Sequence, residues 1–113
     1  MTTDQTTTGR TMLATIEMFE NPTLARDEPT LKEMIYARAA PLAAVEGLRS
    51  KVWFNNADEG RFGAFLIWDS AAALADFRAA ENTDSIAARW GVRPSITDFE
   101  IYQSLVDGVT TRP

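Results

Sequence analysis

Residues 61–69 are predicted to form a β-strand, in which successive side chains point to opposite faces of the sheet. Both faces of this strand are apolar. One face carries Phe62, Ala64, Leu66 and Trp68, and the other carries Gly63, Phe65 and Ile67. Residues 11–19 are similar, with Met12, Ala14, Ile16 and Met18 on one side and Leu13 and Phe19 on the other. Because helices can cover only one face of a small sheet, the other face needs an apolar partner from outside the monomer. A homodimer in which two sheets face each other is the simplest solution.

The segments around these strands alternate between strand and helix patterns. Residues 11–19 form the first predicted strand, and a helical pattern runs from about Asp27 until Gly47. Pro41 removes a helical hydrogen bond, so this helix is expected to kink or to restart as a second one. Residues 48–54 and 61–68 then form a hairpin around the polar loop 55–60.

Two more helices and a strand complete the predicted order. Asp69 or Ser70 caps a helix that ends near residue 82, and a short helix capped by Thr83 ends at Gly91. Residues 95–105 form the last strand. The order β-α-β-β-α-β predicts an α+β fold, a ferredoxin-like antiparallel sheet with helices on one face. The chain of 113 residues suits one domain, residues 11–106, between polar tails at 1–10 and 107–113 that are expected to be flexible.

The sequence contains no His and no Cys. This composition excludes a Ser-His-Asp triad, a Cys nucleophile, a thiolate iron–sulfur site, an imidazole zinc site and a His-ligated haem. Acid–base chemistry falls to Asp, Glu, Lys, Tyr or bound water. The net charge of −5 makes nucleic acid and anionic membranes poor partners. Residues 1–10 have no signal-peptide pattern and no segment approaches transmembrane length, so the expected location is the cytoplasm.

Residues 46–105 carry a set of spaced features that resemble one known family. They are Glu46-Gly47-Leu48, Lys51-Val52-Trp53, Asn55, Gly60, Gly63, the strand end Phe65-Leu66-Ile67-Trp68-Asp69-Ser70 and Phe99-Glu100-Ile101. This pattern resembles the dimeric α+β barrel proteins of the antibiotic-biosynthesis monooxygenase type, and most closely the YdhR-like proteins. The resemblance implies a homodimer whose sheets face each other, with a cavity between the sheet and the helices of each monomer. Many relatives oxygenate phenolic polycyclic substrates with O2 and no flavin, metal or haem, because the substrate anion supplies the electron.

The family's functional residues carry over only in part. Trp68 matches the family's Trp at the end of the third strand. The Asn that the family often has four residues earlier is Ala64 here, and residues 11–19 contain no Asn. The haem-degrading branch uses a His after the Trp, and since this chain has no His, haem degradation of that kind is excluded.

Eight residues are candidates for a site in this cavity, with no cofactor and no metal. Trp68, Tyr102 and Asn55 are the catalytic candidates, and Trp53, Tyr36, Phe77, Arg89 and Trp90 are the candidates for substrate binding. Most of them have a structural alternative. Trp68 suits a core position, Tyr102 suits cross-strand packing, Asn55 suits the hairpin turn, and Tyr36 and Arg89 suit a partly exposed surface. The face that Trp53 occupies depends on the hairpin register.

Three functions remain open at this point. The first is a small cofactor-independent monooxygenase-like enzyme that acts on an aromatic or polyketide-like small molecule. The second is a cofactor-free polyketide cyclase or isomerase that uses the same cavity. The third is a ligand-binding dimer without turnover. Product mass separates them, because an oxygenase adds oxygen, a cyclase gives an isomer of its substrate and a binding protein gives no product.

Overall fold

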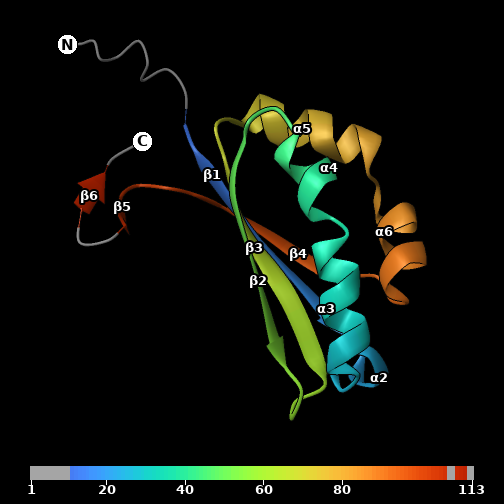
Figure 1. Cartoon of the computed structure of the whole chain (residues 1–113). Coiled ribbons are helices and arrows are strands. Elements are labelled where there is room, and N and C mark those ends of the chain that lie inside the picture. Colours follow the sequence, from blue (N-terminus) through green and yellow to red (C-terminus); the bar gives the residue numbers. More distant parts are fainter. Residues whose placement is uncertain (1–10, 107–108, 112–113) are drawn as a thin grey trace, which may run out of the picture.

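The computed structural model describes residues 11–106 and 109–111, and its main body is a four-stranded antiparallel sheet covered by helices on one side (Figure 1). The strands are β1 (Leu13–Glu20), β2 (Leu48–Asn56), β3 (Arg61–Trp68) and β4 (Ser95–Glu100), in the spatial order β2-β3-β1-β4. This arrangement confirms the predicted ferredoxin-like α+β fold. The predicted tail at residues 1–10, and residues 107–108 and 112–113 of the other predicted tail, lie outside the described residues.

Five helices lie on the same side of the sheet (Figure 1). They are α2 (Pro22–Ala25), α3 (Glu28–Tyr36), α4 (Ala39–Ala43), α5 (Ala71–Ala80) and α6 (Thr83–Trp90). The predicted restart near Pro41 is confirmed, because α3 ends at Tyr36 and α4 begins at Ala39. The sequence analysis did not anticipate α2, although the side chain of Asn21 caps it and Pro22 follows in the first turn, a combination that favours helix initiation.

Of the two predicted helix caps, one is confirmed and the other needs correction. The side chain of Ser70 accepts the backbone N–H of Ala73 and caps α5. The cap of α6 is Asn82 and not Thr83, since the Asn82 side-chain oxygen accepts the N–H of Ser85 and leaves Thr83 as the first helical residue. Gly91 ends α6 in the left-handed conformation at φ 85°, as predicted.

The last strand is shorter than predicted. β4 ends at Glu100, which is paired with Leu13, the first residue of β1, so no strand residue of β1 remains beyond it. After Ile101, whose N–H donates to the carbonyl of Met12, the chain leaves the sheet. Residues 104–106 and 109–111, which the sequence assigned to the strand end and to a tail, form the two-stranded pair β5 (Ser104–Val106) and β6 (Val109–Thr111), apart from the main sheet (Figure 1).

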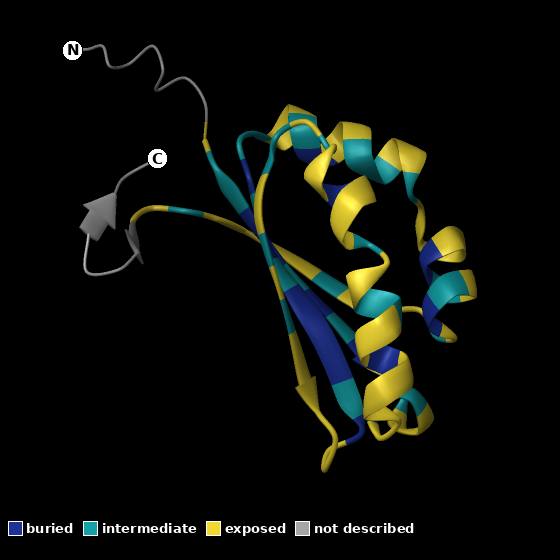
Figure 2. Ribbon diagram, viewed as in Figure 1, coloured by how far each residue is buried: buried dark blue, intermediate teal, exposed yellow. Residues whose placement is uncertain are grey.

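The core lies between the helices and the central strands. β3 is the most buried strand of the sheet (Figure 2). At one end of the core, Phe19 of β1 stacks on Phe62 of β3 with ring centroids 4.9 Å apart, and Trp90 of α6 packs against both rings. At the other end, Trp68 and Leu74 pack together in a second cluster. Both clusters lie on the helix-covered face of the sheet.

The opposite face of the sheet is apolar as well. The pairing register places on it a continuous set of side chains, which we call the open face: Ala14, Ile16, Met18, Val52, Phe54, Phe65, Ile67 and Phe99. Val52 and Phe99 are 54% and 50% exposed. No helix within the described residues lies on this face (Figure 1). Gly63 belongs to the same side, where an added Cβ would stand 2.2 Å from the carbonyl oxygen of Glu17, so only glycine lets β1 and β3 approach this closely.

Candidate functional site

A cavity of about 260 Å³ lies between the helix-covered face of the sheet and the helices α5 and α6. Its apolar walls are Leu66, Trp68, Leu74, Phe77, Ile86 and Ile96. Strand β3 supplies Leu66 and Trp68 because alternate residues of this strand point toward the helices. Helix α5 supplies Leu74 and Phe77, which are three residues apart and therefore lie on one side of the helix.

Trp68 is fixed at one wall of the cavity by a chain of hydrogen bonds. Its indole N–H donates to Oγ1 of Thr15 over 3.2 Å, and the Thr15 hydroxyl donates to Oδ1 of Asp98 over 2.8 Å. Arg78 of α5 donates to both oxygens of Asp98, at 2.6 and 2.7 Å. The hydrogen bonds from Arg78 hold the pKa of the Asp98 carboxyl below its ordinary value. The chain ties β3, β1, β4 and α5 together around the cavity.

A buried carboxylate borders the cavity at the middle of β1. Glu17 points toward the helices, and its carboxylate lies 3.9 Å from Nζ of Lys51 on β2. Burial raises the pKa of Glu17, and the positive charge of Lys51 offsets only part of this effect. Burial also lowers the pKa of Lys51, although the negative charge of Glu17 offsets part of this decrease. The Lys51 ammonium stands 4.3 Å from the centre of the Trp53 ring, a cation–π contact.

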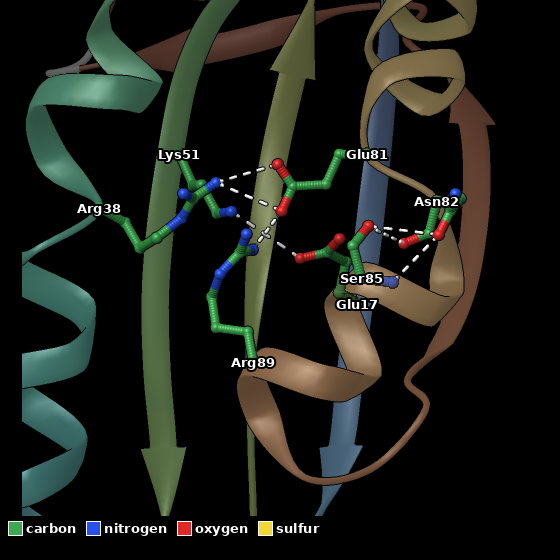
Figure 3. Close-up of polar contacts among 7 residues, drawn as sticks. All are labelled: Glu17, Arg38, Lys51, Glu81, Asn82, Ser85 and Arg89. Atoms are coloured by element: carbon green, nitrogen blue, oxygen red, sulfur yellow. Dashed lines mark hydrogen bonds and ion pairs between the residues drawn. The ribbon is translucent and has the colours of Figure 1, made fainter.

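Three more charged side chains lie beside this pair (Figure 3). Arg38, from the turn between α3 and α4, donates to both oxygens of Glu81 at 3.4 and 3.2 Å. Arg89 of α6 donates to the same carboxylate. Burial opposes the ionisation of Glu81, but its hydrogen bonds and ion pairs with Arg89 and Arg38 outweigh burial and lower its pKa. We call these five residues the ionic cluster: Glu17, Arg38, Lys51, Glu81 and Arg89.

The structure brings two of the eight sequence-predicted residues to the cavity. Trp68 and Phe77 both line it, with ring centroids 5.2 Å apart and planes tilted by 46°. Three others lie at the ionic cluster: Arg89 belongs to it, and Trp53 and Trp90 pack together beside it with ring centroids 5.0 Å apart. The hairpin register places Trp53 opposite Ala64, on the helix-covered face, which answers the question that the sequence left open.

The remaining three candidates lie away from the cavity. Asn55 lies within β2, not in the turn, and donates its side-chain amide to the carbonyl of Ala25 over 3.0 Å, so it holds the hairpin against the end of α2. Tyr102 is 81% exposed and follows the end of β4. Tyr36 is 68% exposed and borders a separate hollow between α3, α4 and β2.

The sequence analysis missed Glu17, Lys51 and Glu81. A signal for the first two was present in the alternation of their strands. Glu17 has the parity of Phe19, and Lys51 has the parity of Trp53, so each charged residue shares the side of an aromatic residue that faces the helices. A charge at such a position is rarely found without a partner. Glu81 gave no such signal, because it follows the last turn of α5 and its partners come from distant segments.

Among the described residues, no three His, Cys, Asp or Glu side chains are grouped closely enough to hold a metal ion. None of the helices in the described part of the chain is long and apolar enough to cross a membrane.

The fold is that of ferredoxin-fold proteins of the antibiotic-biosynthesis monooxygenase type, as the resemblance predicted. A variant of SnoaB, a cofactor-independent oxygenase from Streptomyces nogalater, is similar at 15% identity and a TM-score of 0.59, over 85% of this chain and 98% of that one. A heme-degrading protein from Mycobacterium tuberculosis is similar at 22% identity and a TM-score of 0.61, over 86% and 98% of the two chains.

A third similar structure is a ferredoxin-fold protein from Listeria monocytogenes that is related to antibiotic biosynthesis monooxygenases. It has 16% identity and a TM-score of 0.59, over 78% of this chain and 54% of that one. No family model and no curated protein matches the sequence. At these identities the likeness establishes the fold, and the YdhR-like subtype stays a prediction.

Proposed function

We propose that the protein is a cofactor-independent, monooxygenase-like enzyme that acts on an aromatic or polyketide-like small molecule in the cavity beneath α5 and α6. The observation that carries this proposal is the cavity itself, a mainly apolar space with two aromatic walls, Trp68 and Phe77. Three charged residues also line it: Glu17, Arg78 and Glu81. Flat, largely apolar molecules bind in cavities of this kind, and a few polar groups of the protein fix the orientation of the bound molecule. The fold shared with a cofactor-independent oxygenase adds support.

The size of the cavity narrows the substrate class. Its volume of about 260 Å³ lies near the lower end of small-molecule pockets, which span roughly 300–1,000 Å³. A molecule of one or two fused rings suits this space, as does the reacting end of a longer polyketide-like chain. The His-dependent haem chemistry of related proteins stays excluded by the composition of this chain.

The proposed reaction needs little from the protein. The substrate loses a proton and its anion transfers electrons to O2, after which one oxygen atom is incorporated and the other leaves as water. All four electrons that reduce O2 come from the substrate, so a CH2 group of an aromatic ketone becomes a carbonyl. The protein has to exclude water, favour the substrate anion and leave space for O2 beside the reacting carbon.

A cyclase or isomerase in the same cavity is the second candidate. The position at which relatives often have Asn is Ala64, which is buried and offers no side-chain donor. The acid–base groups of the ionic cluster suit a reaction in which a proton moves and no oxygen is added. A ligand-binding dimer without turnover is the third candidate.

We further propose that two copies of the chain pair through the open face. The set of apolar side chains on it is continuous across four strands, and Val52, Phe54 and Phe99 are all exposed in the single chain. Exposed apolar patches of this kind mark interfaces in folded proteins. A cytoplasmic location stays a prediction from the sequence.

The test is an oxygen-uptake screen with one- and two-ring phenols and aromatic ketones, with no cofactor added. The proposal predicts O2 consumption and, under isotopically heavy O2, a product that contains one heavy oxygen atom. A product isomeric with its substrate, formed without O2 uptake, would replace the oxygenase with a cyclase or isomerase. Saturable binding with no product would leave a binding protein, and either of these results contradicts the proposed oxygenation.

A further inference from the structure

We propose that Glu17 is the proton acceptor of the cavity. Its carboxylate would take the proton from the weakly acidic O–H or α-C–H group of a phenol or an aromatic ketone, and the surrounding cations would stabilise the anion that remains. The inference rests on the proposed function in one respect, that the cavity binds such molecules. It names the residue that performs the first chemical step, whether oxygenation or isomerisation follows.

The position of Glu17 gives its carboxylate access to a bound molecule. Glu17 lies in the middle of β1, opposite Ala64 on β3 and Ile96 on β4. Its side chain borders both the cavity and the small gap beneath the ionic cluster. At 3.9 Å, the Lys51 ammonium is too far for a hydrogen bond. Among the described residues, no other side chain forms an ion pair with this carboxylate, so its oxygens are available to a ligand.

The charges around Glu17 favour the products of the proton transfer. Lys51 approaches from β2, Arg38 from the turn before α4, Arg89 from α6, and Arg78 and Glu81 from α5 and its end. Once Glu17 is protonated, the ionic cluster holds three cations and the single carboxylate of Glu81. An enolate or phenolate in the adjacent cavity then replaces the negative charge that Glu17 has lost. No electrons are lost in this step, because the proton moves to Glu17 while its bonding pair stays on the substrate.

Two further observations support the assignment. Burial raises the pKa of Glu17, which makes its carboxylate a stronger base than an exposed one and brings it closer to the pKa of a phenol. The Lys51 side chain is held against the Trp53 ring and is itself largely buried, so its ammonium is already positioned before a ligand arrives. Glu81, in contrast, is engaged by two arginines and has a lowered pKa, so it is a poor base.

The experiment is the exchange of α-hydrogens of 2-tetralone for deuterium in D2O without O2, followed by NMR. This ketone has two fused rings, as the proposed substrates of the cavity do. When a base removes an α-proton, the C–H electron pair forms the enolate and the negative charge moves to the carbonyl oxygen. We expect the wild-type protein to accelerate exchange, and Glu17→Gln to lose about 10²- to 10⁴-fold of this acceleration, the usual contribution of a general base. Glu17→Asp, which keeps a shortened carboxylate, should retain part of it.

The control is Glu20→Gln, which removes an exposed carboxylate three residues further along β1 and should leave exchange unchanged. The rate in wild-type protein should also rise with pH through one ionisation above the ordinary carboxyl pKa and then level off. This pH profile needs no variant and so tests the inference even if Glu17→Gln does not fold. Exchange that survives in a folded Glu17→Gln variant, or a rate that only follows hydroxide concentration, would overturn the role of Glu17.

The same experiment separates this inference from the proposed oxygenation. Glu17-dependent exchange together with no O2 uptake on any phenol would keep Glu17 as the base and remove the oxygenase. O2 uptake that is unchanged in Glu17→Gln would keep the oxygenase and remove Glu17. If 2-tetralone neither binds to wild-type protein nor exchanges its hydrogens there, both the cavity function and the role of Glu17 are contradicted.

Discussion

The indole N–H of Trp68 donates to Oγ1 of Thr15 across the β1–β3 pair, and both side chains are almost fully buried. Since Thr15 in turn donates to Asp98, the indole is anchored to the neighbouring strand and to the ion pair that Asp98 makes with Arg78. A buried indole N–H needs a hydrogen-bond acceptor, and Thr15 supplies it here. The hydrogen bond fixes the plane of the ring that forms one wall of the cavity.

Replacing Thr15 by Val should test this anchoring. Val has nearly the same shape, but it leaves the buried Trp68 N–H without an acceptor, which costs about 1–3 kcal/mol of unfolding free energy. Chemical denaturation of the purified variant measures this loss. The matched control is Thr30→Val, at an exposed position of α3 away from the sheet, where a change within about 0.5 kcal/mol is expected. Equal stabilities of the two variants would show that the hydrogen bond contributes nothing.

Replacing Trp68 by Phe should lower both stability and ligand affinity. The smaller ring leaves an unfilled space in the core, at a cost of roughly 1–3 kcal/mol, and it changes a wall of the cavity. Trp90→Phe is the control, because Trp90 is equally buried but packs in the other cluster, with Phe19 and Phe62. We expect a similar loss of stability in both variants and weakened binding of 1-naphthol in the Trp68 variant alone. If both variants bind equally well, Trp68 is only a core residue.

The contribution of Asp98 to the free energy of unfolding should decrease as the pH is lowered. Its pKa is lowered in the folded protein, so its contribution is complete above the ordinary value of 3.8 and is lost as the pH falls through the lower, folded value. The unfolding free energy of wild type should therefore exceed that of Asp98→Asn at neutral pH, and the difference should shrink below pH 3.8. Because the Arg78–Asp98 pair is partly exposed, we expect a difference of at most about 1 kcal/mol.

The control for this pH series is Asp58→Asn, an exposed residue of the hairpin turn, whose effect should be small at every pH. The comparison uses denaturation curves measured between about pH 2 and about pH 7, the range in which carboxyl groups titrate. A difference between wild type and Asp98→Asn that grows on acidification would contradict the assignment.

Placing a charge on the open face should separate the proposed dimer. Phe99→Lys puts an ammonium group at a position that would face the partner sheet, where it would lose its hydration without an opposite charge. Analytical ultracentrifugation should show wild type as a dimer and the variant as a monomer. Tyr36→Lys, which alters an exposed aromatic residue on α3 away from the sheet, should leave the dimer intact. A monomeric wild-type protein would contradict pairing through this face.

The sequence predicted the order of β1 to β4 and of the helices α3 to α6 because each of these elements had a local signal. A run that is apolar on both faces marked β3, and Pro41 marked the break between α3 and α4. Ser70 marked the start of α5, and Gly91 marked the end of α6. The end of β4 could not be found in the same way. It depends on where β1 begins, and this is a property of the pairing and not of residues 95–105 alone.

The site was predictable only where a residue had a strong local pattern. Trp68 was a candidate because it matches the Trp that the resembled family has at the end of the third strand, and Phe77 falls at helical spacing with Leu74. Glu17 and Lys51 come from strands that lie on either side of β3, so their approach to 3.9 Å follows from the sheet order. Tyr102 was a candidate because its phenol suits the chemistry, but the chain leaves the sheet before it and its side chain is exposed.

The most direct test of the central claim, that the cavity binds a small aromatic molecule, is an NMR titration of the three tryptophan indole N–H signals with 1-naphthol. The signals of Trp53, Trp68 and Trp90 can be assigned with single Trp→Phe variants. We predict that the Trp68 signal shifts strongly and saturably, because its ring forms a wall of the cavity and its N–H is held by Thr15. A Trp68 signal that stays unchanged at saturating 1-naphthol would contradict the account.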